Sequence, residues 1–219
     1  MRGSQDVADE VLDQILERVG GEPFAILGNS WGGMLARYVA HERRAQTLGL
    51  ATVAGVFVAR PTERIVPSRT VLREDPRVVE ILGGALQQYR EDAVVESTED
   101  AYAFLQHVLP GLDGADQRAL DDLSQNYALD REPEDARPDP FLQPTLHITG
   151  MQDQIVGYSD AWDRIPHYPR ASFVALDGAG HNILFERLNV CSTMITDWLA
   201  RIRELPKPSS LGNRAAEPA

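Results

Sequence analysis

The sequence predicts an α/β fold built on a mainly parallel sheet. Short apolar runs recur along the chain and end at glycine or polar residues, which indicates buried strands. Between these runs lie segments whose apolar residues recur at helical spacing. Strands that alternate with helices imply right-handed βαβ units. The 219 residues suffice for one sizeable core with an inserted subdomain.

The N-terminal part predicts a helix, a strand, a second helix and a second strand. Helical spacing predicts a helix over residues 6–19, with Ser4 as its N-cap. The apolar run at residues 23–28 predicts a buried strand, and helical spacing resumes over residues 31–43. A second buried strand is expected at residues 48–55.

The alternation resumes in the C-terminal part. Residues 145–150 and 172–176 predict the third and fourth strands, with a short helix at 158–165 between them. A last amphipathic helix is expected over residues 185–203. It contains Cys191, the single cysteine, which we expect to be buried.

A block of helical pattern interrupts the alternation between the second and third strands. Residues 58–139 hold proline breaks and amphipathic stretches, and they end in a charged, proline-bearing linker. A cap inserted over an active site would have this pattern. We therefore assign residues 1–57 and 140–204 to a core, residues 58–139 to a helical cap and residues 205–219 to a flexible tail.

The apolar side chains of this cap have two interpretations. They either shape a small hydrophobic pocket for a substrate or pack within the cap itself. The residues concerned are Leu82, Leu86, Tyr102, Phe104 and Leu105.

Charge and composition narrow the classes of partner. The formal net charge is −12, and such a surface repels phosphate backbones and anionic membranes, so we expect no nucleic-acid or membrane partner. No run approaches the roughly 18 apolar residues of a membrane span, and no signal-peptide pattern is present. One cysteine forms neither an intramolecular disulfide nor a cysteine-based metal cluster. We expect a cytoplasmic protein that acts on a small molecule without metal or organic cofactor.

The motif that carries chemistry is Gly28-Asn29-Ser30-Trp31-Gly32, between the first strand and the second helix. A sharp strand-to-helix turn would expose Ser30 at its tip in a strained conformation, and the flanking glycines would relieve the crowding. The helix that follows aims its first amides at the site, so the Trp31 amide is a predicted oxyanion donor. The alternative interpretation is a glycine–serine turn without chemistry, because short motifs also arise by chance.

A nucleophilic serine needs a base, and the base needs an acid that orients it. Among the five histidines, His181 follows the fourth predicted strand, and catalytic groups gather at the carboxyl ends of parallel strands. Asp153 follows the third strand in the same way, which gives the chain order Ser30, Asp153, His181. Asp177 is the rival acid, although it lies close to His181 in sequence.

These residues resemble the α/β-hydrolase superfamily. The similarity is carried by residues 28–33, by Thr149-Gly150-Met151-Gln152-Asp153 and by Gly178-Ala179-Gly180-His181, and it extends over almost the whole chain. The resemblance implies Ser30 as nucleophile, His181 as base and Asp153 as acid. It also implies a helical cap and a carboxylesterase-like serine hydrolase that acts on an ester, amide or related carbonyl compound.

Narrower resemblances point to two alternative enzymes. The Gly-Asn-Ser-x-Gly-Gly form is similar to that of hydrolases that cleave carbon–carbon bonds in ring-fission products. The Ser-Trp-Gly form is similar to that of proline iminopeptidases. A serine nucleophile argues against haloalkane dehalogenases and epoxide hydrolases of this fold, which use aspartate.

The chain departs from the superfamily at its front. Members begin with about four strands and a His-Gly type loop that supplies the second oxyanion amide, and we expect this sheet to be N-terminally shortened. Losing one oxyanion donor typically costs on the order of 10²- to 10³-fold in turnover. The strand at residues 24–27 becomes an open apolar edge, which favours self-association or cover by another chain. A catalytically weak or inactive homologue that acts as a binding module is therefore the alternative function.

Overall fold

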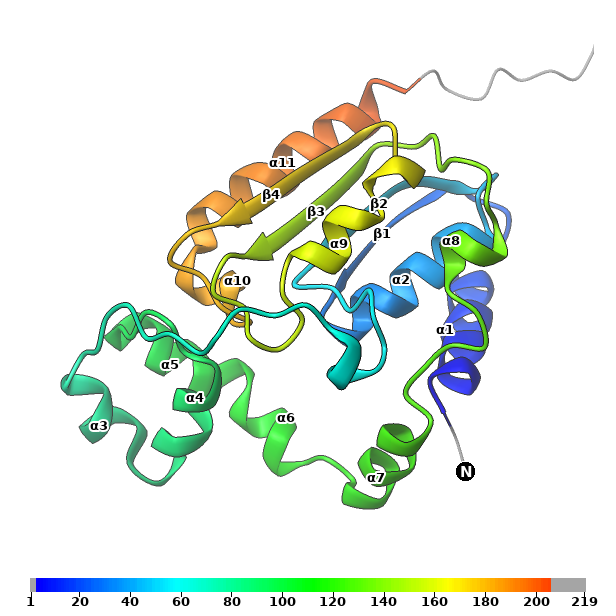
Figure 1. Cartoon of the computed structure of the whole chain (residues 1–219). Coiled ribbons are helices and arrows are strands. Elements are labelled where there is room, and N and C mark those ends of the chain that lie inside the picture. Colours follow the sequence, from blue (N-terminus) through cyan, green and yellow to red (C-terminus); the bar gives the residue numbers. More distant parts are fainter. Residues whose placement is uncertain (1–2, 206–219) are drawn as a thin grey trace, which may run out of the picture.

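A computed structural model describes residues 3–205, and it has the predicted alternation of strands and helices (Figure 1). One sheet has the order β1-β2-β3-β4, and each neighbouring pair is parallel. The strands are β1 (Phe24–Asn29), β2 (Thr47–Val53), β3 (Thr145–Gly150) and β4 (Ala171–Leu176). The predicted mainly parallel α/β fold is therefore confirmed. Of the tail expected at 205–219, residues 206–219 lie outside the described residues.

Helices precede, separate and follow the strands. Those of the first part and of the inserted segment are α1 (Ser4–Val19), α2 (Trp31–Glu42), η1 (Pro61–Glu63), α3 (Arg77–Leu82), η2 (Gly83–Ala85), α4 (Leu86–Asp92), α5 (Thr98–His107), α6 (Leu109–Asp113), α7 (Gln117–Gln125) and α8 (Pro133–Ala136). The C-terminal part has α9 (Ser159–Asp163), η3 (Ile165–His167), α10 (Ile183–Glu186) and α11 (Leu188–Arg203). Within residues 3–205, no helix combines the length and apolar character needed to cross a membrane.

The start of α1 differs from the prediction. The N-cap is Gly3, whose amide donates to the Asp6 carboxylate at 2.9 Å, and Ser4 already lies inside the helix. The buried Ser4 hydroxyl accepts a hydrogen bond from Nε1 of Trp31 at 3.0 Å. The Ser4 cap prediction was wrong because its partner is a tertiary contact, which local sequence does not show.

The predicted last helix is interrupted. A separate turn, α10, precedes α11, and the backbone of Arg187 between them is not helical, with φ −134° and ψ 36°. The Arg187 side chain donates to the carbonyl of Asp177. Cys191 in α11 is fully buried, as expected.

The two faces of the sheet are covered by different helices (Figure 1). Successive residues of a strand point to opposite faces. In β2, Leu50 packs with Ala36 and Ala40 of α2 on one face. On the other face, a Cβ atom on Gly49 would lie 2.5 Å from Ile202 of α11, so glycine allows this close approach. The sheet is thereby held between α2 and α11.

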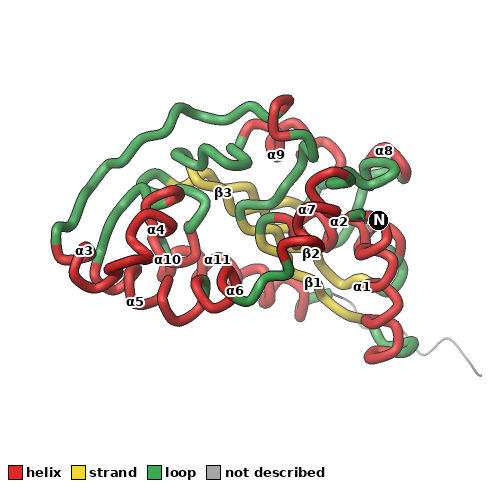
Figure 2. Tube along the Cα trace, turned by 90° about the horizontal axis from the view of Figure 1, so that it is seen from below, coloured by secondary structure: helices red, strands yellow, loops and turns green. Residues whose placement is uncertain are grey.

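In the inserted segment, α3, α4 and α5 lie at one end of the molecule and α8 lies toward the other, with α6 and α7 between them (Figure 2). Helices α3, α4 and α5 share an apolar cluster of their own that includes Leu82 and Phe104, whereas Tyr102 is 61% exposed. These contacts match the cap-packing interpretation of the segment's apolar residues. Beyond α7, Leu129 joins the main core cluster, and α8 packs against α2 through Glu134. The division of the chain at residues 58 and 139 stays a prediction.

Strand β1 forms one edge of the described sheet. It pairs with β2 and with no other strand of residues 3–205. Ala25 is exposed and Leu27 is 42% exposed on the face that α2 does not cover. An apolar edge strand offers unpaired backbone groups to another chain.

We predict that the isolated chain self-associates through β1. Leu27→Lys places a charge on the exposed edge, so this variant should keep the mass of one 24.2 kDa chain while the unmodified protein gains mass with concentration. Light scattering after size-exclusion chromatography measures both. Leu188→Lys, at a 57% exposed position of α11, is the control. Equal masses for the unmodified protein and Leu27→Lys at every concentration would contradict the prediction.

Candidate active site

Ser30 lies at the turn that joins β1 to α2. Its φ is 51° and its ψ is −122°, a region that costs a residue other than glycine on the order of 1–3 kcal/mol. Its amide donates to the Val53 carbonyl at 2.9 Å, and its carbonyl accepts from Gly33 at 2.9 Å and from Val56 at 3.1 Å. The strained turn is therefore fixed by hydrogen bonds on both sides of the serine.

Two of the three glycines around Ser30, Gly28 and Gly33, are required by close packing. A Cβ atom on Gly28 would lie 2.0 Å from the Gly32 carbonyl oxygen, and one on Gly33 would lie 2.8 Å from Cα of Gly55. A Cβ atom on Gly32 would meet no atom within 4 Å. The predicted crowding is therefore present at Gly28 and Gly33, and it is absent at Gly32.

Ser30, His181 and Asp153 are joined by hydrogen bonds. Nε2 of His181 lies 2.8 Å from Oγ of Ser30, and its Nδ1 lies 3.0 Å from Oδ2 of Asp153. The fully buried Asp153 carboxylate also accepts the amides of Ile155 at 2.8 Å and Val156 at 3.0 Å through Oδ1. The structure thus brings the three predicted site residues together and holds the acid in one orientation.

Asp153 and His181 are carried by loops that leave β3 and β4. A Cβ atom on Gly150 would lie 2.4 Å from the carbonyl oxygen of Ala179, so glycine lets the two loops touch. The carboxyl ends of neighbouring parallel strands lie at one edge of the sheet, as expected for a site of this kind. Two loops distant in sequence thereby bring Asp153 to His181 and His181 to Ser30.

The rival acid Asp177 has a different partner. Its Oδ1 accepts a hydrogen bond from Nε2 of Gln152 at 3.0 Å. Oε1 of Gln152 in turn accepts the amides of Gly178 at 2.9 Å and Ala179 at 3.2 Å. Asp177 therefore helps to join the two loops, and the acid bonded to the imidazole is Asp153.

Trp31 opens α2 directly after the serine. Amides in the first turn of a helix have no carbonyl partner within that helix, and the helix dipole is positive there. The indole of Trp31 turns toward α1, where it bonds to Ser4. The oxyanion role of the Trp31 amide stays a prediction. Among residues 3–205, no group of three His, Cys, Asp or Glu side chains is placed to hold a metal ion.

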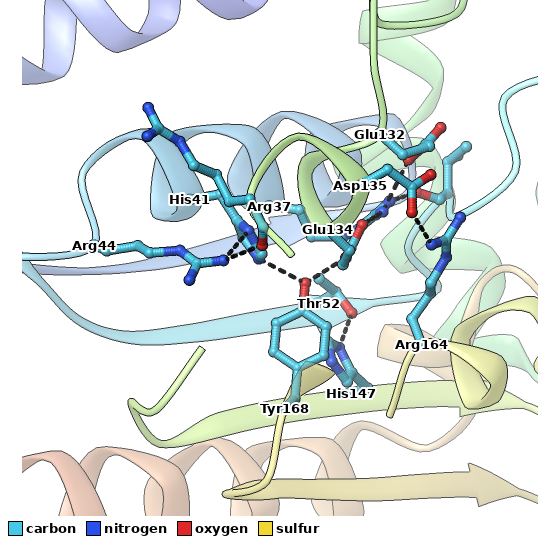
Figure 3. A network of polar contacts seen from close by, with 12 residues as sticks. Arg37, His41, Arg44, Thr52, Glu132, Glu134, Asp135, His147, Arg164 and Tyr168 are labelled. Atoms are coloured by element: carbon cyan, nitrogen blue, oxygen red, sulfur yellow. Dashed lines mark hydrogen bonds and ion pairs between the residues drawn. The ribbon is translucent and has the colours of Figure 1, made fainter. Parts of the chain in front are cut away.

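The buried ion pair of Arg37 and Glu134 (Figure 3) is linked to the turn at Ser30 through the backbone of Val56. Arg37 of α2 has no exposed surface and binds the equally buried Glu134 of α8 with Nε at 2.8 Å and Nη2 at 2.5 Å. Its Nη1 donates to the Val56 carbonyl at 2.8 Å, and the Val56 amide is the donor to Ser30. Burial favours the neutral form of Glu134, but the Arg37 charge and its hydrogen bonds lower the pKa of that carboxyl overall.

Two buried histidines, His41 and His147, lie near this ion pair (Figure 3). Nε2 of His41 lies 3.1 Å from the hydroxyl of Tyr168, which donates to Glu134. Nδ1 of His147 lies 2.8 Å from Oγ1 of Thr52. Burial lowers the pKa of His41 to about 4 and that of His147 to about 3. Both imidazoles are therefore neutral at pH 7.

No sequence pattern predicted this network. Glu134 stands in a charged stretch between prolines, which predicts a solvated linker, and its partner Arg37 is 97 residues away. A carboxylate in such a run is usually solvated, and pairing at that distance depends on the completed fold.

The comparisons with known proteins agree with this fold. A family model described as alpha/beta hydrolase fold matches residues 2–188, so the chain belongs to the α/β-hydrolase family. A search of curated proteins found no match.

Solved structures of the same fold include several hydrolases. An alpha/beta superfamily hydrolase from Oenococcus oeni PSU-1 is 24% identical, with a TM-score of 0.85 over 92% of this chain and 75% of that one. A thermophilic esterase is 17% identical, with a TM-score of 0.60 over 92% of this chain and 75% of that one. The 2-hydroxy-6-oxo-6-phenylhexa-2,4-dienoate hydrolase from Rhodococcus sp. strain RHA1 is 19% identical, with a TM-score of 0.62 over 90% of this chain and 72% of that one.

We predict that the protein loses stability at low pH because His147 is buried in its neutral form. Because the folded pKa of His147, about 3, lies below its usual value of 6.5, the unfolded chain binds more protons between these values. The free energy of unfolding should therefore fall as the pH is lowered from about 6.5, by up to about 1.4 kcal/mol per pH unit for this group. Urea unfolding at a series of pH values measures the slope.

A non-titrating variant isolates the histidine. His147→Asn should flatten the acid slope relative to the unmodified protein, whereas His107→Gln, at an exposed position of α5, should leave it unchanged. An unaltered slope in His147→Asn would contradict the assignment of the acid sensitivity to this imidazole.

Proposed function

We propose that the chain is a serine hydrolase that cleaves an ester, amide or related carbonyl compound through Ser30, His181 and Asp153. The observation that carries this proposal is the hydrogen-bond chain from Oγ of Ser30 through the imidazole to the buried Asp153 carboxylate. The chain's membership of a hydrolase family and the hydrolases among the solved structures that share its fold support the same proposal.

In the proposed mechanism, each of these groups has a step. Oγ of Ser30 attacks the substrate carbonyl carbon while Nε2 of His181 takes the hydroxyl proton. The negative charge that develops on the carbonyl oxygen is met by the Trp31 amide at the positive end of α2. The imidazolium then gives its proton to the leaving group, which departs with the electron pair of the broken bond. An acyl ester on Ser30 remains.

Water completes the cycle. Nε2 of His181 takes a proton from water as the oxygen attacks the acyl carbon, and the proton returns to Oγ of Ser30 as the acid leaves. Throughout both halves Asp153 holds the proton-bearing Nδ1 and so keeps Nε2 facing the serine. The two backbone amides on Oδ1 of Asp153 prevent its carboxylate from turning away.

An apolar pocket is lined in part by Trp31, the residue after the proposed nucleophile, whereas Ser30 and His181 are not among its lining residues. The pocket has a volume of about 300 Å³ and lies between α1, the start of α2 and α7. It is lined by Val7, Trp31, Ala119, Leu120, Asp122 and Leu123. Pockets of this size and character suit small organic ligands.

Labelling of Ser30 by a fluorophosphonate probe tests the proposal. The probe phosphonylates a serine only when a base activates it, so the unmodified protein should be labelled and Ser30→Ala should not. His181→Ala should lower p-nitrophenyl acetate hydrolysis about 10²- to 10⁴-fold, because the general base is lost. Ser124→Ala, at an exposed serine of α7, is the matched control and should label fully.

The outcomes also separate the alternative functions. A folded protein that is neither labelled nor hydrolytic would overturn the proposal in favour of a binding module. If Ser30 is labelled but simple esters are not cleaved, cleavage of a prolyl anilide would favour the proline iminopeptidase alternative. Cleavage of a ring-fission dienoate would favour the carbon–carbon bond hydrolase alternative.

A further inference from the structure

Glu186 makes contacts that the proposed mechanism does not use. It lies in α10, five residues after His181, and its carboxylate accepts three backbone hydrogen bonds. Oε2 accepts the amide of Gly180 at 2.6 Å, and Oε1 accepts the amides of Val94 at 2.7 Å and Val95 at 3.1 Å. One side chain therefore holds two separate stretches of backbone.

The two stretches belong to different parts of the fold. Gly180 directly precedes His181 in the loop that leaves β4. Val94 and Val95 form the connection between α4 and α5 in the inserted segment. The Glu186 carboxylate is thus a bridge from the loop that carries the candidate base to the segment predicted to be the cap.

The bridged segments also touch directly. A Cβ atom on Gly180 would lie 2.6 Å from Cγ2 of Val94 and 2.9 Å from the carbonyl oxygen of Asp92. The absent side chain therefore lets the Gly180 backbone lie against the end of α4. Beside it, Nε2 of Gln154, one residue after Asp153, donates to the carbonyl of Glu91 at 2.7 Å. The loops of both the acid and the base are docked on the same end of α4.

A carboxylate is needed for this bridge. Both of its oxygens accept, and hydrogen bonds from amides to an ionised carboxylate are among the stronger ones in proteins. Burial raises the pKa of Glu186, and the hydrogen bonds from the three amides act against that shift. A glutamine at this position would keep one accepting oxygen and turn an NH₂ group toward a backbone N–H, so it could hold one segment but not both.

We propose that Glu186 is a positioning residue that couples the Val94–Val95 segment to the His181 loop and so keeps the imidazole in hydrogen-bonding reach of Ser30. The inference rests on the proposed function for its catalytic consequence. Glu186 touches no reacting atom. A displacement of about 1 Å in a catalytic group can cost on the order of 10²-fold in rate, so a small shift of this loop would be measurable.

Glu186→Gln tests the coupling by two readouts. In kinetics with p-nitrophenyl acetate, we expect kcat to fall about 10- to 100-fold while KM changes less than about twofold, because alignment of the base is lost and the pocket is kept. In amide hydrogen exchange, residues 92–96 and 178–182 should both exchange faster, because one shared anchor is broken.

A matched control separates positioning from general stability. Glu80→Gln makes the same chemical change at an exposed position of α3 and should leave both readouts at their unmodified values. A purely structural role of Glu186 would raise exchange across the whole chain or lower the melting temperature, with kcat at 25 °C unchanged. That result would overturn the proposal.

The exchange readout keeps this inference separate from the proposed function. Unchanged exchange at residues 92–96 and 178–182 in folded Glu186→Gln would overturn the coupling, whatever the activity. If the unmodified protein has no hydrolase activity, paired acceleration of the two segments would still support the coupling. In that case it is the proposed function that fails, by the absence of Ser30 labelling.

Discussion

The strained turn at Ser30 is the constraint on which the rest of the site depends. Its positive φ is held because Gly28 and Gly33 allow backbone contacts that a side chain would block. The turn points Oγ toward His181, and α2 begins at the next residue, Trp31. Arg37 donates to the Val56 carbonyl, and the Val56 amide donates to the Ser30 carbonyl, so Arg37 is linked to the turn through Val56. Energy stored in the turn is thus balanced by packing and hydrogen bonds that the fold supplies around it.

Local signals were sufficient to predict the strands, and they placed Ser30, Asp153 and His181 at one edge of the sheet, where the structure brings them together. Ser30 directly follows β1, Asp153 and His181 lie in the loops after β3 and β4, and the carboxyl ends of parallel strands meet at one edge of a sheet. Ser4 was assigned wrongly because local sequence cannot show that its hydroxyl meets Trp31. The same limit explains why spacing along a helix predicted 185–203 as continuous, although one non-helical residue divides it.

The long-range polar contacts were beyond sequence reasoning for a common physical reason. Arg37 and Glu134 are 97 residues apart, and Glu186 and Val94 are 92 apart. A charged residue is normally solvated, so burial of these carboxylates becomes favourable only when the fold brings donors to both oxygens. These two contacts tie the inserted segment to the α/β core at two places, one behind the serine and one beside the histidine. The site therefore depends on residues that no local sequence pattern identifies.

We infer that Ser30 carries the acyl group during turnover. Rapid-quench mass spectrometry with a slowly hydrolysed p-nitrophenyl ester detects this intermediate, because the acyl-enzyme is covalent and adds the mass of the acyl group to one peptide. We expect transient acylation of the peptide that contains Ser30, formed as fast as p-nitrophenol is released. Turnover of the ester with no acylated peptide, or with the acyl group on another residue, would contradict it.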